Sequence, residues 1–242
     1  MNIMHKKQYY DSCFTVNKDN YDDFCQMAAD TKPQQIELLH TTIEFLVKIN
    51  VPYWLSHGTL LAAYRDNGVM IRHDVDTDIA ILESDLKKIK NLLHLFPPCN
   101  KYKVNISSAF DDKGNEIKFT PSENSYKRIK IENIESEEIY VKERNHKYHL
   151  VACDLYTFSQ DEDNPELLRN NYTTLSGHDY FRPMERDVIF PLKTMIFEGG
   201  EYACPNDPKT YLETLYGYIG EGAFYNPDTK LYQKQNEIGE IN

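Results

Sequence analysis

Apolar residues recur at helical spacing between residues 33 and 49. Ile36, Leu39, Ile43 and Leu46 fall on one face, so the pattern predicts an amphipathic helix over 33–49. Pro33 suits its first position. His40, Glu44 and Lys48 are expected to face outward. The polar residues before it predict an N-terminal arm over 1–32, loosely structured or with a short helix.

The next stretch predicts the order strand, helix, strand, helix. Residues 51–56 read as a short strand that turns at His57-Gly58 into a helix over 60–64, which 66-DNG-68 ends. Residues 79–82 predict a buried strand. Ser84 then caps a helix that runs to Phe96 and stops at Pro97-Pro98.

From residue 102 to residue 158 the hydrophobic period changes to two, which is typical of strands. Strands are expected at 102–106, 116–119, 126–131, 139–142 and 150–158, with a turn at 111–115. A further strand is expected at 188–190, and a helix over 208–216 that Gly217 ends. Without an evident linker, the chain predicts one catalytic domain over 33–220 and a tail over 221–242.

Composition and charge narrow the function classes. The 242 residues are 40% hydrophobic and carry a formal net charge of −11, with no run of Lys or Arg longer than two. The chain therefore lacks the basic footprint of a protein that binds nucleic acid polymers. A small anionic nucleotide can still bind where a metal and backbone N–H groups supply positive potential.

The cysteines and the hydropathy of the chain indicate the cellular compartment in which we expect the protein. Five widely spaced cysteines without a CxxC pair argue against a disulfide framework and against a cysteine-based zinc site. No window approaches the apolar length of a membrane span, and the first residues lack a signal-like apolar core. We expect a soluble, cytoplasmic protein without an integral membrane segment; recruitment to a membrane surface by another subunit stays open.

Two aspartates begin the strand at 79–82. Asp76 and Asp78 point to the same side because side chains alternate along a strand. Packing does not favour two repelling carboxylates, whereas a hard cation such as Mg²⁺ does. The D-x-D pair of Asp161 and Asp163 lies instead in a polar loop and is expected to be a solvated turn.

Gly58 and Thr59 lie between a strand and a helix, where backbone N–H groups and the helix dipole can hold phosphate oxygens. His57 precedes this turn and either contacts a ligand or has a structural role. Asp154 is isolated in the apolar segment 150-LVACDLYTF-158. It is a candidate third carboxylate; its alternative role is to cap a backbone group.

These features together resemble a known family. Gly-Thr, a helix and D-x-D on the next strand resemble the polymerase-β-like nucleotidyltransferase superfamily. The segment 51-VPYWLSHGTLLAAYRDNGVMIRHDVDTDIAIL-82 is similar to the signature of the LicD/fukutin family, and 187-DVIFPLKTMIFEGGEYACPNDPKTYLETLYG-217 resembles its C-terminal pattern. The resemblance spans about residues 35–220. The departures are His73, Val75 and Thr77 around the acidic pair and Ala62 in place of a glycine.

The resemblance implies an α+β fold, a nucleotidyltransferase-like mixed β-sheet with flanking helices. It implies a transferase that moves a phosphate-linked group, such as phosphocholine or an alditol phosphate, from a CDP-linked donor to a glycan hydroxyl and releases CMP. By position, Asp76, Asp78 and Asp154 become catalytic ligands of Mg²⁺ or Mn²⁺. The implied donor-binding residues are Gly58, Thr59, Arg65 and His57.

Several alternatives remain open at this point. Asp154, Asp74 or His73 could accept the acceptor's proton, and we favour Asp154. The chain could instead transfer NMP from an NTP, or be a silent nucleotide- or glycan-binding protein. His146, His149 and Cys153 lack the second ligand pair of a zinc site. Trp54 is expected in the core rather than stacked on a base.

Overall fold

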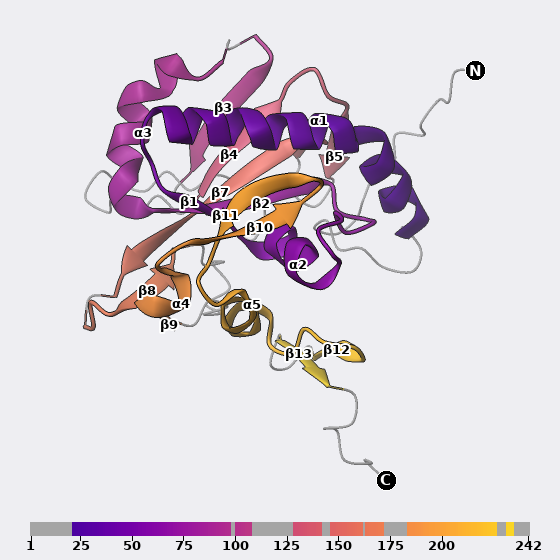
Figure 1. Ribbon diagram of the computed structural model, residues 1–242. Coiled ribbons are helices and arrows are strands. Elements are labelled where there is room, and N and C mark those ends of the chain that lie inside the picture. Colours follow the sequence, from indigo (N-terminus) through magenta and orange to yellow (C-terminus); the bar gives the residue numbers. More distant parts are fainter. Residues whose placement is uncertain are drawn as a thin grey trace.

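The computed structural model describes residues 21–97, 100–107, 128–141, 146–161, 163–171, 183–226 and 231–234. Its centre is a seven-stranded mixed sheet with the order β1-β2-β7-β4-β3, to which β8 and β9 are joined beside the far end of β7 (Figure 1). The strands are β1 (Tyr53–Leu55), β2 (Asp76–Leu82), β3 (Tyr102–Ser107), β4 (Arg128–Asn133), β7 (Ala152–Gln160), β8 (Leu167–Asn170) and β9 (Met184–Glu185). β2 and β7 run parallel, and the other neighbours run antiparallel. The expected mixed sheet with flanking helices is confirmed.

Helices and, among the described residues, three hairpins lie outside this sheet. The helices are α1 (Tyr21–Lys48), α2 (His57–Arg65), α3 (Leu86–Leu92), α4 (Arg186–Ile189) and α5 (Pro208–Tyr216), with 3-10 turns η1 (Glu83–Asp85) and η2 (Leu93–Leu95) on either side of α3. The hairpins are β5 (Glu138–Val141) with β6 (His146–His149), β10 (Lys193–Phe197) with β11 (Gly200–Cys204), and β12 (Ala223–Asn226) with β13 (Leu231–Lys234). α1 lies across one face of the sheet, and β11 packs against β1 (Figure 1).

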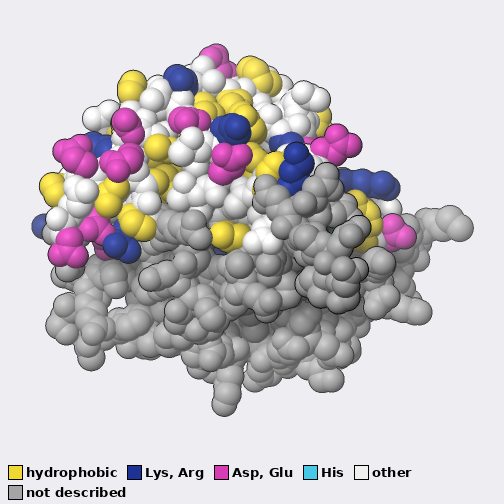
Figure 2. Space-filling view, turned by 90° about the horizontal axis from the view of Figure 1, so that it is seen from below, with side chains coloured by type: hydrophobic (Ala, Val, Ile, Leu, Met, Phe, Trp, Pro, Cys, Tyr) yellow, Lys and Arg dark blue, Asp and Glu magenta, His cyan; other side chains and the backbone are white. Residues whose placement is uncertain are grey.

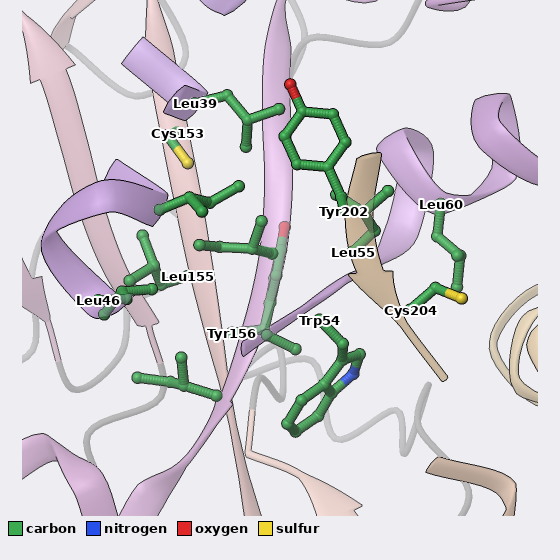
Figure 3. Close-up of a cluster of buried hydrophobic side chains, with 14 of the residues drawn as sticks. Leu39, Leu46, Trp54, Leu55, Leu60, Cys153, Leu155, Tyr156, Tyr202 and Cys204 are labelled. Carbon is green, nitrogen blue, oxygen red and sulfur yellow. The ribbon is translucent and has the colours of Figure 1, made fainter. Parts of the chain in front are cut away.

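One face of the sheet is apolar because the strands alternate. Ile79 on β2 and Leu155 on β7 are partners in the register and are fully buried, and Cys153 lies two residues before Leu155 on the same face. Leu39 and Leu46 of α1 cover this face (Figure 3). Burying a leucine of this kind contributes about 2 kcal/mol. The opposite face carries the even-numbered residues of β2 and β7, among them Asp76, Asp78 and Asp154.

The first helix begins earlier than expected. It starts at Tyr21, so the expected start at Pro33 is wrong and Pro33 lies inside the helix. Phe24 and Ala28 are buried, and they continue the apolar face towards the N-terminus. Their packing offsets the hydrogen bond that a proline in a helix interior removes. Of the expected arm, residues 21–32 are therefore helical, and residues 1–20 lie outside the described residues.

Other boundaries were set by contacts distant in sequence. The strand expected at 188–190 is wrong, because 186–189 form the single turn α4, whose Val188 and Ile189 carbonyls accept N–H groups of Asp207 and Asn206. The strands expected at 102–106, 126–131, 139–142 and 150–158 are confirmed as β3, β4, β5 and β7 with shifted ends. The expected elements at 111–115 and 116–119 lie outside the described residues.

Local signals placed α2 and α5 well, whereas the expected cap at Ser84 is wrong, because Ser84 lies inside η1 and Asp85 is at the N-cap of α3. α2 ends where Asn67 and Gly68 adopt positive φ angles of 55° and 78°, as the D-N-G sequence predicts. α5 spans the expected residues, begins with an Asp207 side chain that accepts the Thr210 N–H, and ends at Gly217. A Cβ at Gly217 would lie 2.5 Å from the Tyr232 carbonyl oxygen, so this close approach requires glycine.

The described surface shows mixed charge. Seen from below, acidic and basic side chains neighbour one another over the described part of that face and do not gather into one basic area (Figure 2). Within the described ranges, every helix falls short of the length and apolarity needed to cross a bilayer.

Candidate active site

Three carboxylates meet at the beginning of the two parallel strands. Asp78 on β2 and Asp154 on β7 are direct partners in the register, and Asp76 lies two residues before Asp78 on the same face. Each of the three offers a carboxylate oxygen, and these oxygens lie within 4.8 Å of one another. The strand pairing therefore brings together side chains that are far apart in sequence.

The turn at His57-Gly58 holds Asp78. The Gly58 N–H donates a hydrogen bond to Asp78 Oδ2 at 3.0 Å, and the Asp78 N–H donates to Thr59 Oγ1 at 2.8 Å. His57 adopts a left-handed φ of 42°, which is uncommon for a residue with a side chain. The start of α2 is thus fastened to the start of β2 by both backbone and side chain.

Arg128 holds Asp154. Its guanidinium Nη1 lies 2.9 Å from Asp154 Oδ2, and the two side chains are 12% and 3% exposed. Arg128 comes from β4, the neighbour of β7, whose Lys130 is the register partner of Asp154. The second oxygen, Asp154 Oδ1, is buried and accepts no hydrogen bond from the residues that the structure describes.

The acidic groups strongly influence one another. Burial and the neighbouring charge of Asp76 hold the pKa of Asp74 and of Asp78 well above the ordinary carboxyl value. Burial and Asp154 also raise the pKa of Asp76, while Lys130 and Arg128 oppose this shift. Such a cluster is costly while it is charged, because the repulsion and the lost hydration are only partly compensated.

A divalent cation fits this donor set. Carboxylate oxygens are the ligands that Mg²⁺ and other hard cations take, and a cation would compensate the repulsion. The buried Asp154 Oδ1, which lacks a hydrogen bond among the described residues, supplies a ligand atom. Asp76, Asp78 and Asp154 thus form a cluster that can hold a divalent metal ion.

The comparison with known families agrees with this geometry. Residues 50–207 match the family model described as LicD/FKTN/FKRP, nucleotidyltransferase domain. The chain belongs to this family. The match includes all three carboxylates and Arg128.

Individual relatives share shorter segments. The LicD-family chain is 36% identical over 75 residues to the uncharacterized protein RP689 of Rickettsia prowazekii, covering 31% of this chain and 27% of that protein. It is 40% identical over 60 residues to the uncharacterized protein RT0683 of Rickettsia typhi, covering 25% of this chain and 19% of that protein. The matches thus span about a quarter or less of these curated relatives. Among solved structures, the lincosamide antibiotic adenylyltransferase LnuA, bound to lincomycin, has 13% sequence identity and a TM-score of 0.40 over 79% of this chain and 89% of that chain.

The four expected donor-binding residues have different surroundings in the structure. Gly58 and Thr59 lie beside the carboxylates and hold Asp78, as described above. His57 is buried and stacks on Tyr156 with 3.8 Å between ring centroids. Arg65 lies at the end of α2, where its guanidinium forms two hydrogen bonds with Asp66. Contact of these residues with a donor stays a prediction for this LicD-family domain.

Asp74, a candidate base from the sequence, borders the cluster, because a Cβ at Gly58 would lie 2.7 Å from Asp74 Oδ2. Two basic residues near the site were not assigned to it from the sequence. Arg128 and Lys130 lie two residues apart on one face of β4, and this alternation can be read from the sequence. Their nearness to Asp154 cannot be read from the sequence, because it depends on which strand pairs with β7.

Trp54 is fully buried, as expected. Cys153 lies in the core beneath α1 (Figure 3), on the opposite sheet face from Asp154, while the side chain of His146 lies outside the described residues. Asp161 does form a turn, accepting the N–H groups of Asp163 and Asn164. It is buried and paired with Arg169, so the expectation of a solvated residue is wrong for Asp161.

Gly58→Ala is expected to disturb the site more than the fold. The added Cβ would meet Asp74 Oδ2 at 2.7 Å and Asp78 Oδ2 at 3.3 Å, and these flexible carboxylate ends must shift. Since displacements of about 1 Å can cost up to ~10²-fold in rate, we expect turnover to fall roughly tenfold to a hundredfold. Gly199→Ala, in a hairpin turn with nothing within 4 Å, is the control. It should lower the melting temperature slightly and leave turnover unchanged; equal turnover in both variants would contradict the prediction.

Stability of the metal-free protein should fall as the pH rises. The raised pKa values of Asp74, Asp76 and Asp78 mean that the folded protein holds more protons than the unfolded chain above pH ~4, the ordinary carboxyl pKa. Unfolding free energy therefore decreases with pH through the window up to the raised values. Urea unfolding in EDTA across this range would measure the slope. Added Mg²⁺ or Mn²⁺ should stabilise most at the higher pH, where the ligands are deprotonated.

Proposed function

We propose that this LicD-family domain transfers a phosphate-linked group, of the phosphocholine or alditol phosphate type, from a CDP-linked donor to a glycan hydroxyl. The observation that carries the proposal is the cluster of Asp76, Asp78 and Asp154. Arg128 and Lys130 flank it on the neighbouring strand. Together they offer metal ligands and cationic side chains where a diphosphate would carry its charge.

Asp76, Asp78 and Asp154 would hold Mg²⁺ or Mn²⁺. When bound, the ion neutralises negative charge that develops on the phosphate oxygens. The chain's own residues position these ligands: Gly58 and Thr59 fix Asp78, and Arg128 fixes Asp154 while leaving Oδ1 for the ion.

The reaction moves one phosphoryl-linked group and one proton. The acceptor hydroxyl oxygen forms a bond to the phosphorus that carries the transferred group, and the bond from that phosphorus to the CMP oxygen breaks. The acceptor proton passes to a carboxylate. Asp74 suits this role better than the expected Asp154, since it borders the cluster without being one of its three members, whereas Asp154 binds Arg128 and would bind the ion.

The test is product analysis with defined donors. Purified protein with Mn²⁺ is incubated with CDP-choline, CDP-ribitol, CDP-glycerol and the four NTPs, with and without simple glycosides, and CMP and pyrophosphate are separated by mass-resolved chromatography. CMP from one CDP-linked donor, increased by a glycoside, is the expected result. Pyrophosphate with a nucleotidylated product would favour NMP transfer instead. Silence from every donor would favour a binding protein.

A further inference from the structure

A line of hydrogen-bonding side chains leads from the core to His57. Trp54 Nε1 donates to the Tyr211 hydroxyl at 3.2 Å, that hydroxyl lies 2.6 Å from Ser56 Oγ, and Ser56 Oγ lies 2.9 Å from His57 Nδ1. Trp54, Ser56 and Tyr211 are fully buried, and His57 is 8% exposed. The line joins β1, the turn before α2, and α5.

Counting hydrogens gives this line a direction. The indole N–H can only donate, so the Tyr211 hydroxyl accepts from it. If both hydroxyl hydrogens stay within the line, Tyr211 donates to Ser56 Oγ and Ser56 donates to His57 Nδ1, which accepts. A neutral imidazole that accepts at Nδ1 carries its hydrogen on Nε2.

The ring is held neutral and in one plane. Burial, together with the charge of Arg128, lowers the pKa of His57 to about 3, so the imidazole is uncharged at neutral pH. It stacks on Tyr156 with 26° between the ring planes, and Tyr216 meets its edge with centroids 6.5 Å apart. Ring rotation would break both the stack and the bond to Ser56.

His57 is also placed beside the carboxylate cluster. Its neighbour Gly58 donates to Asp78, and its stacking partner Tyr156 lies two residues after Asp154 on the same face of β7. Arg128, whose charge acts on His57, is paired with Asp154. The imidazole therefore lies near residues that hold two of the three carboxylates.

The local structure gives up ordinary stability for this arrangement. Ser56 is at the N-cap of α2, where serine usually accepts a helix N–H, but its hydroxyl makes no such bond. His57 itself adopts a left-handed φ of 42°. Strained backbone of this kind persists where the surroundings hold it and is concentrated at functional sites.

We propose that Trp54, Tyr211 and Ser56 fix His57 as the Nε2–H tautomer, and that this N–H donates a hydrogen bond to a phosphate oxygen of the ligand at the carboxylate cluster. An uncharged N–H donor at this point binds the phosphate by a hydrogen bond without transferring its proton to it. His57 is a binding residue, and Trp54, Tyr211 and Ser56 are positioning residues. The phosphate contact rests on the proposed function, whereas the tautomer does not.

The tautomer can be tested by NMR without any substrate. Long-range ¹H–¹⁵N spectra of the full chain labelled with [¹⁵N]histidine separate Nε2–H, Nδ1–H and imidazolium forms, and His57→Gln identifies the His57 signals. We expect the Nε2–H pattern at pH 7 and a changed tautomer population in Tyr211→Phe and in Ser56→Ala. Tyr202→Phe removes the hydroxyl of another buried tyrosine, which bonds His40 outside this line, and should leave the His57 pattern unchanged. An Nδ1–H pattern in the parent protein would overturn the assignment. So would a His57 pattern that stays unchanged in both Tyr211→Phe and Ser56→Ala.

The phosphate contact is tested by adding Mg²⁺ with inorganic pyrophosphate and, separately, Mg²⁺ with CDP. Both should move the His57 Nε2–H signal downfield, and Tyr211→Phe should bind Mg²⁺-pyrophosphate roughly fivefold more weakly, as expected for one hydrogen bond. A signal that neither ligand moves would overturn the contact. A response to pyrophosphate without one to CDP would support the contact and count against the cytidine part of the proposed function.

Discussion

Asp78→Asn is expected to abolish turnover while leaving the fold intact. The asparagine side chain keeps an oxygen that can accept the Gly58 N–H, so the junction of α2 and β2 is preserved. It lacks the negative charge that binds a divalent cation. Metal ions supply several kcal/mol of charge stabilisation in phosphoryl transfer, and each ~1.4 kcal/mol is a factor of ten, so the loss should be about 10³-fold.

Without metal, the same change should not destabilise the protein. Burial and the neighbouring Asp76 and Asp74 raise the pKa of Asp78, which means that its charged form is unfavourable in the folded state. Asn removes that cost, so urea unfolding in EDTA should give an equal or higher unfolding free energy, while Mn²⁺ binding measured by titration calorimetry is lost. Asp163→Asn, the same substitution at an exposed loop aspartate, is the matched control and should change neither quantity. Turnover of Asp78→Asn within tenfold of the parent protein would contradict the metal assignment.

Arg128→Met is expected to lower the unfolding free energy of the metal-free protein by about 3 kcal/mol. The methionine retains an apolar stem but leaves Asp154 buried without its ion-pair partner, and removing one partner of a buried pair typically costs ~3–5 kcal/mol. Nearby Asp78 adds repulsion, because it is the register partner of Asp154. Urea unfolding in EDTA measures this effect.

Saturating Mn²⁺ should restore part of the stability lost in Arg128→Met, because the cation neutralises Asp154 in place of the guanidinium. Arg65→Met is the control, since Arg65 and Asp66 form an exposed pair with side chains 42% and 32% exposed. Exposed pairs contribute ~0–1 kcal/mol, so its loss should be small and insensitive to metal. Equal losses in the two variants, or no recovery of Arg128→Met with Mn²⁺, would contradict the role given to Arg128.

The sequence alone predicted the local parts of this fold and site. Helix-ending signals at Asn67-Gly68 and Gly217 depend only on the conformations that neighbouring residues adopt, and both were confirmed. The shared face of Asp76 and Asp78 follows from strand alternation, which is equally local. Asp154 stood out because a charged residue within an apolar strand requires a partner.

Tertiary structure decided everything that depends on pairing between distant segments. β7 pairs with β2 on one side and β4 on the other, and this brings Arg128 to Asp154; no local pattern specifies that choice. Tyr211 reaches Ser56 only because α5 packs against α2. Pro33 lies inside α1 because burial of residues such as Phe24 outweighs a local helix-start signal. Local propensity is worth tenths of a kcal/mol to about 1 kcal/mol per residue, and the burial of one large side chain is worth more, so packing prevails where the two disagree.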